Sequence, residues 1–81
     1  MSDNAVIGCV GVLHVATRGA AGPGEALVKV RGGTEAFMAW SEQPLPMGTR
    51  VLVVESRGSR TVDVVEWPEK AADPLDELDA L

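Results

Sequence analysis

Two Val-rich segments separated by a short polar turn are the feature of this 81-residue sequence that most limits its fold. The segments are residues 50–55 and 60–67, and the turn between them is Ser56-Arg57-Gly58-Ser59. β-branched side chains lose rotamer freedom in a helix but pack well on a pleated sheet, so both segments are predicted to be strands. Together they predict a β-hairpin, and neither strand carries a reactive group.

Three further strands are predicted upstream of this hairpin. In residues 6–17, Gly8 and Gly11 disfavour a helix, and half of the residues are β-branched, so an extended strand with a glycine-permitted bend is expected. Residues 25–31 and 34–41 are also predicted to be strands. The Gly32-Gly33 pair between them supplies the positive φ angles that a two-residue hairpin turn requires.

Two connecting segments are predicted to be loops. Residues 18–24 are rich in Gly and Pro, and residues 42–49 contain two prolines, which cannot donate a hydrogen bond to a strand ladder. Five strands with regularly spaced turns predict an all-β fold, and a closed or nearly closed barrel removes exposed strand edges. The barrel domain is predicted to span residues 1–67, followed by a tail at 68–81.

The net charge of −5 is concentrated in this tail. Residues 1–67 hold seven acidic and six basic residues, a net charge of −1, whereas residues 68–81 hold five acidic residues and one basic residue, a net charge of −4. Nucleic-acid affinity depends on clustered Lys and Arg that release counterions from phosphates. A near-neutral body with an acidic tail therefore makes nucleic acid an unexpected partner.

The tail carries a short helical pattern. Asp73 is a suitable N-cap, Pro74 suits the first helical position, and three leucines at spacing i, i+3, i+6 share one face: Leu75, Leu78 and Leu81. An isolated helix of fewer than about 12 residues is marginal in water. Two interpretations stay open: a solvated, acidic terminus, or a docking helix that contacts a partner or a neighbouring subunit of a homo-oligomer.

The sequence predicts a soluble, cytoplasmic protein. Cys9 is the single cysteine, so no intramolecular disulfide can form, and a reduced, buried thiol is expected. The first residues lack the basic region of a signal peptide, and the apolar runs are shorter than the roughly 20 residues of a membrane span.

No catalytic, metal or cofactor site is predicted. His14 is the single histidine, and no segment supplies a recognisable nucleophile and orienting carboxylate for it, so the chain is not expected to be an enzyme. His14 and Cys9 are five residues apart in an extended run, which places them on opposite faces. The Gly-rich loop 18–24 lacks the Gly-Lys-Ser/Thr signature of a phosphate-binding loop.

Two sets of residues are candidates for partner contacts. Trp40 and Trp67 are candidate anchors for a protein partner, because Trp is enriched at interface hot spots, although Trp67 is also suited to capping one barrel end. A candidate basic patch would form if the strand 25–31 and the turn 56–59 lay together, and its members are Lys29, Arg31, Arg57 and Arg60. Phe37 and Trp40, three residues apart in one strand, face opposite sides and so make a poor stacking platform for bases.

The motifs and their order resemble the soluble C-terminal domain of NfeD-type proteins. The resemblance covers about residues 6–67 and rests on Gly8-Cys9-Val10-Gly11, Gly22-Pro23-Gly24, the segment 35–40, Gly48-Thr49-Arg50-Val51-Leu52-Val53-Val54 and Val62-Asp63-Val64. It implies a five-stranded OB-like β-barrel that serves as a non-catalytic interaction module alongside flotillin-like (SPFH) membrane-scaffold proteins. The membrane-spanning helices and protease-like domain of longer members have no counterpart in this sequence, so contact with a membrane is expected through the partner.

Three functions are therefore weighed. A protein-interaction barrel that binds a flotillin-like scaffold is favoured, and an OB-type binder of single-stranded nucleic acid or oligonucleotide is the alternative. A lipoyl or biotinyl carrier domain is disfavoured, because Lys29 lies inside a predicted strand rather than at a hairpin tip.

Overall fold

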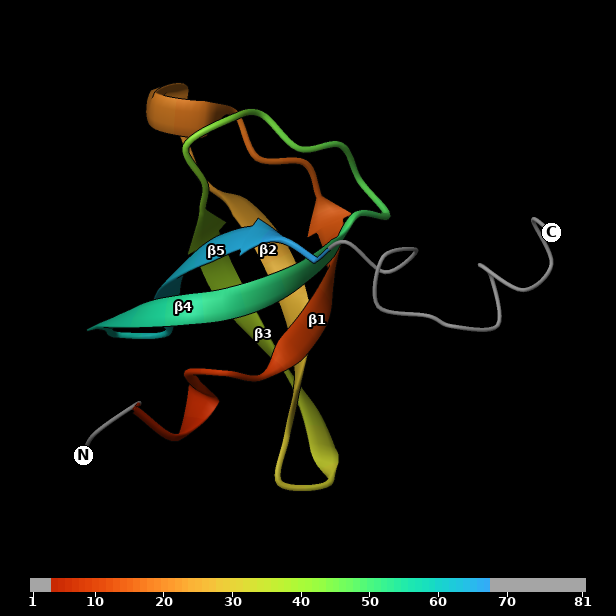
Figure 1. The fold of residues 1–81 in the computed structure, drawn as a ribbon, viewed down its shortest axis with the longest axis vertical. Helices are drawn as coiled ribbons and strands as arrows, with labels where there is room; N and C mark the ends of the chain where they lie inside the picture. The colour runs from red at the N-terminus through yellow and green to blue at the C-terminus, as the bar shows by residue number, and fades with distance from the viewer. Residues whose placement is uncertain (1–3, 68–81) are drawn as a thin grey trace, which may run out of the picture.

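Five strands close into a barrel in the order β1-β2-β3-β5-β4 in the computed structural model, which describes residues 4–67 (Figure 1). The strands are β1 Val10–Val15, β2 Gly24–Val30, β3 Gly33–Trp40, β4 Arg50–Gly58 and β5 Thr61–Glu66. The predicted all-β, five-stranded barrel is confirmed. The predicted acidic tail, with its three leucines, lies outside the described residues.

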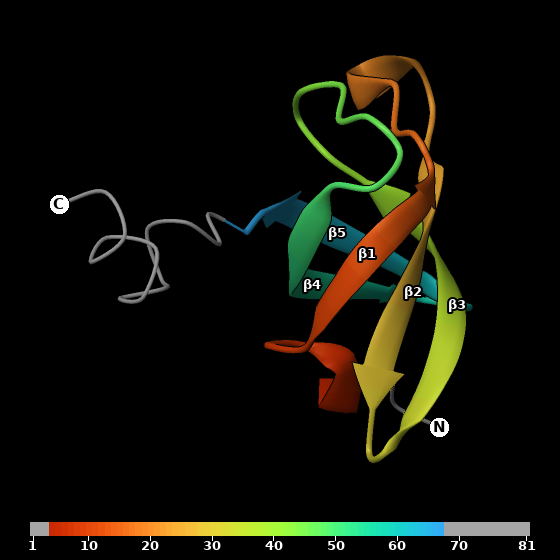
Figure 2. The ribbon, with the colours of Figure 1, turned by 90° about the vertical axis from the view of Figure 1, so that its right-hand side faces the viewer.

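The barrel is closed by a short parallel ladder between β3 and β5. All other neighbouring strands are antiparallel. The parallel ladder has three residue pairs: Met38↔Thr61, Ala39↔Val62 and Trp40↔Asp63. Parallel strands cannot be joined by a tight turn and need a longer connection. Here that connection consists of residues 41–49 and β4. Figure 2 shows the β4–β5 hairpin crossing the β2–β3 hairpin to make this closure.

Both hairpin turns lie at different residues from those predicted. The β2–β3 turn is Arg31-Gly32, with φ angles of 52° and 82°, and the β4–β5 turn is Ser59-Arg60, with φ angles of 53° and 56°. Two residues with positive φ define the type I′ turn, whose twist matches the flanking strands. The predicted turns at Gly32-Gly33 and at 56–59 are therefore wrong by one or more residues, because β3 starts at Gly33 and β4 continues to Gly58.

The predicted strand over residues 6–17 is correct only in its middle part. Residues Asn4–Val6 form a 3₁₀ turn, and the chain reverses at Gly8, whose φ is 90°. The strand proper then begins at Val10. Gly11 is required by close packing, because a Cβ there would lie 2.6 Å from the carbonyl oxygen of Leu27 on β2. The predicted loop 18–24 contains a second 3₁₀ turn, Gly19–Ala21.

The barrel interior is filled by aliphatic side chains, as expected for a barrel too small to enclose a ligand. Its single buried aromatic ring is Phe37. Every strand contributes, and the buried apolar residues are Val6, Leu13, Ala26, Val28, Phe37, Ala39, Val51, Val53, Val62 and Val64. Cys9, expected to be buried, is half-buried and packs against this core.

Candidate functional site

The C-terminal half of β5 has one open edge. The parallel ladder between β3 and β5 stops at Trp40↔Asp63, because β3 ends at Trp40. Residues 64–66 continue to pair with β4, through Leu52↔Val65 and Val51↔Glu66. Within residues 4–67, no strand pairs with their other edge.

The backbone of Glu66 points to this open edge. The N–H of Trp67 donates to the carbonyl oxygen of Arg50 on β4 at 2.8 Å. In an antiparallel ladder, the residues whose backbone groups face the partner strand alternate with residues whose groups face away. Because Trp67 faces β4, the N–H and C=O of Glu66 face away from β4, towards the open edge.

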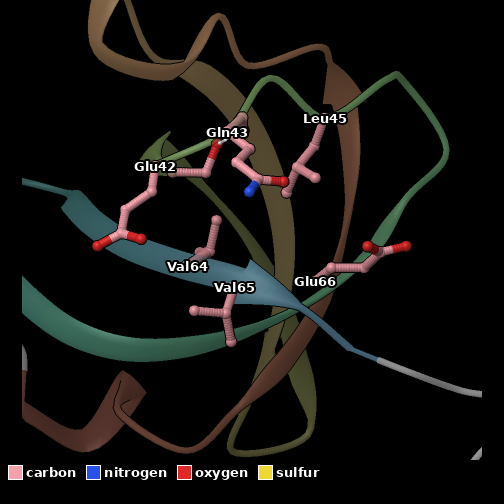
Figure 3. Close-up of a pocket in the computed structure, with 7 residues that line it drawn as sticks. Glu42, Gln43, Leu45, Val64, Val65 and Glu66 are labelled. Atoms are coloured by element: carbon pink, nitrogen blue, oxygen red, sulfur yellow. Dashed lines mark hydrogen bonds between the residues drawn. The ribbon is translucent and has the colours of Figure 1, made fainter.

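A hollow of about 190 Å³ lies beside this edge, and we call it the β5 groove (Figure 3). One wall is β5, and the other is the segment that follows β3. Val64 is buried, and Leu45 packs against the core, so the floor of the β5 groove is apolar. Glu42 and Glu66 are exposed at its two ends in Figure 3. The lining residues are Ser41, Glu42, Gln43, Leu45, Val64, Val65 and Glu66.

Thr17, two residues after the end of β1, holds the loop wall of the β5 groove. Its side chain is buried, with an exposed fraction of 2%. The backbone N–H of Leu45 donates to Thr17 Oγ1 at 2.8 Å, and the N–H of Thr17 donates to the Leu45 carbonyl oxygen at 2.9 Å. Thr17 Oγ1 also shares a hydrogen bond of 2.6 Å with Ser41 Oγ. The buried hydroxyl and the backbone N–H of Thr17 therefore both hold the loop wall in place.

Trp40 lines a second hollow that is adjacent to the β5 groove, since the two share four lining residues. The guanidinium carbon of Arg57 is 5.1 Å from the centroid of the Trp40 ring. Arg57 also donates two hydrogen bonds to the Asp63 carboxylate, at 3.1 and 2.8 Å. The hydrogen bond to Asp63 raises the pKa of Arg57, a side chain that is always charged in proteins, so a cation lies over the ring.

The second predicted anchor, Trp67, is half-buried and directly follows the open edge of β5. This placement is compatible with both roles, barrel cap and partner contact, and each stays a prediction. The three tail leucines that were also predicted as contacts lie outside the described residues. Sequence reasoning thus named the two tryptophans beside the groove but missed the groove itself.

The four predicted basic-patch residues lie on two different hairpins. Arg60 donates to Glu35 at 2.9 Å and lies 5.4 Å from the centroid of the Phe37 ring. Glu35 is opposite the inward-facing Val28, whereas Lys29 is opposite Thr34 and is exposed on the other face of the hairpin. The turn that contains Arg31 is remote from the turn that contains Arg60 in both Figures 1 and 2. The basic patch stays a prediction.

His14 has a partner that the sequence did not reveal. Its Nε2 is 2.5 Å from Oε1 of Glu25. Glu25 pairs with Val15 in the β1–β2 ladder, and the register shifts between Leu13 and Val15, where His14 lies. In the part of the chain that the structure describes, no three His, Cys, Asp or Glu side chains gather in a way that would hold a metal ion. Over the same residues, no helix has the length and apolarity to cross a membrane.

These features define a small closed β-barrel domain in which the C-terminal half of β5 has an open edge beside a groove. The chain belongs to the NfeD family, since the model of the NfeD C-terminal domain matches residues 10–65. No match was found among curated protein sequences.

The solved structures similar to this chain include two NfeD-type domains. The soluble domain of the NfeD protein YuaF from Bacillus subtilis is 31% identical, with a TM-score of 0.61, over 73% of this chain and 70% of that one. The C-terminal domain of stomatin operon partner protein 1510-C from Pyrococcus horikoshii is 28% identical, with a TM-score of 0.61, over 83% of this chain and 95% of that one.

Proposed function

We propose that this chain is a non-catalytic protein-interaction domain that binds a flotillin-like (SPFH) membrane-scaffold protein and reaches the membrane from the cytoplasm through it. The observation that carries the proposal is the β5 groove, where an open strand edge lies over an apolar floor, next to the hollow that the half-buried Trp40 lines. Trp side chains beside a hollow are the residues that most often dominate the energy of protein interfaces.

Two further observations support a protein partner. The outer surface next to the groove carries two exposed apolar side chains, since Val54 and Val65 are 43% and 45% exposed. The similar 1510-C domain is described as that of a stomatin operon partner protein, which is consistent with a membrane-scaffold partner here.

Binding to the purified SPFH protein from the same cell tests the proposal. We expect saturable binding by calorimetry, and we expect Trp40→Ala to weaken it by at least tenfold, because buried Trp anchors contribute about 2 kcal/mol or more. Val15→Ala is the control, since Val15 is 49% exposed on β1, outside the lining of the groove. The proposal is wrong if no saturable binding occurs, or if both variants bind equally well.

The alternative function, binding of single-stranded nucleic acid, has less support. Arg57 and Arg60 cover the rings of Trp40 and Phe37 and are paired with carboxylates, so bases cannot stack there without displacing them. We expect a single-stranded oligonucleotide to give no signal in a titration at low salt. Binding that weakens steeply with added salt would favour the alternative instead.

A further inference from the structure

We propose that the β5 groove binds its partner by strand addition, in which an extended segment with an apolar residue between two basic residues pairs with the edge of β5. The inference deepens the proposed function and rests on it only in requiring a protein partner. It specifies the binding geometry and the chemistry of the bound segment, whichever protein carries that segment.

The backbone of the edge is suited to a new strand. The Glu66 N–H and C=O point away from β4, and no loop residue in the described range makes a backbone hydrogen bond with residues 64–66. Such an edge is a template for pairing with an added strand. The neighbouring β3 already shows the geometry, since it pairs with the first half of β5 along this same edge.

The side chains of the groove select the sequence of the added strand. Side chains on one face of a strand recur every second residue. An apolar side chain placed over Val64 and Leu45 would thus have neighbours two residues away in both directions, near the two ends of the groove. Glu42 and Glu66 are exposed at those ends, so Lys or Arg is the complementary residue there.

A pair of substitutions isolates the backbone contribution. Glu66→Pro removes both the carboxylate and the edge N–H, but it leaves the hydrogen bonds of Val65 and Trp67 to β4 in place. Glu66→Ala removes the carboxylate alone. The residue before a proline is restricted to extended conformations, which Val65 already has as a strand residue.

The test is an NMR titration of the full chain with the synthetic peptide Thr-Lys-Thr-Val-Thr-Lys-Thr. We expect the largest chemical shift changes at the backbone amides within residues 41–45 and 64–66. The Glu66→Pro variant should bind the peptide at least tenfold more weakly than Glu66→Ala. Replacing the two lysines of the peptide by glutamates should abolish binding. A peptide N-methylated on the amides that face β5 should also fail to bind, which tests the inference without changing the protein.

The inference is overturned by three results. The first is that the peptide does not bind, and the second is that the chemical shift changes are spread over acidic residues away from the groove. The third is that the Glu66→Pro and Glu66→Ala variants bind the peptide equally well while the N-methylated peptide binds as tightly as the unmodified one. The proposed function fails separately, if the peptide binds at the β5 edge but the SPFH protein does not bind the chain.

Discussion

The guanidinium of Arg57 lies over the ring of Trp40 while its N–H groups bind the carboxylate of Asp63. The position of Arg57 in β4 explains this geometry, because the register between β4 and β5 shifts between Ser56 and Gly58. A bulge redirects the side chain of the extra residue. The bulge at Arg57 accounts for the direction of its side chain, towards the Trp40 ring.

The first prediction concerns this contact. Arg57→Ala should lower the urea midpoint slightly, and the loss should shrink in 1 M NaCl, because exposed ion pairs are screened by salt. Lys29→Ala is the control, since Lys29 is exposed on the outer face of β2. If both variants unfold at the same midpoint at low salt, the Arg57 contacts do not stabilise the barrel.

The second prediction compares two glycines that each begin a strand. A Cβ at Gly24 would lie 2.2 Å from the carbonyl oxygen of Val15, whereas the nearest atom to a Cβ at Gly33 is 3.8 Å away. Gly24→Ala should therefore lower the free energy of unfolding by about 1–3 kcal/mol, as overpacking does. Gly33→Ala should change it by less than about 0.5 kcal/mol. Urea denaturation measures the free energy of unfolding of both variants. An equal change in the two variants would contradict the close packing at Gly24.

The third prediction concerns the hydroxyl that fixes the groove wall. Thr17→Val keeps the shape of the side chain but leaves the N–H of Leu45 without its acceptor, which should cost about 1–3 kcal/mol. Amide hydrogen exchange at Leu45 should accelerate at the same time. Thr17→Ser, which keeps the hydroxyl, should exchange nearly as slowly as the unchanged protein. Unaltered exchange in Thr17→Val would show that the wall is held by other contacts.

The fourth prediction concerns the β2–β3 turn. Arg31 has a φ of 52°, a conformation that side chains with a Cβ disfavour, and Gly32 follows it. Arg31→Asn creates the Asn-Gly pair preferred by type I′ turns, so it should raise the free energy of unfolding by roughly 0.5–1 kcal/mol. The thermal midpoint should rise accordingly. Lys29→Asn, inside β2, should lower it instead, because Asn is disfavoured in strands.

The strands were predictable because their signals are local. A high Val content and the alternation of apolar and polar residues are typical of a strand, and each of the five strands overlaps a predicted one. The predicted turns were displaced because Arg31, Ser59 and Arg60 adopt positive φ angles. The register of the paired strands requires these angles, and residue preference alone does not indicate them. The pairing of His14 with Glu25 depends in the same way on the register of β1 and β2.

The groove was not predicted because it arises from a pairing between distant strands. Trp40 was identified from its residue type alone. The open edge exists because β3 ends at Trp40 while β5 continues to Glu66, and only the order of strands in the barrel brings those ends together. A partial signal was present in Pro44 and Pro46, which cannot donate to a strand ladder and so predicted a loop in this region.

The three-pair ladder between β3 and β5, which we call the clasp, joins the β2–β3 hairpin to the β4–β5 hairpin and so closes the barrel. It is shorter than the seven-pair ladder between β2 and β3, and it joins strands that no tight turn connects. The β1–β4 ladder also has three pairs, but four further backbone hydrogen bonds, made by Gly8, Cys9 and Leu13, extend it. Local opening of the native state should therefore begin at this clasp, before either hairpin comes apart. A strand added beside residues 64–66 would lengthen the clasp, so occupancy of the groove and resistance of the barrel to opening should rise together.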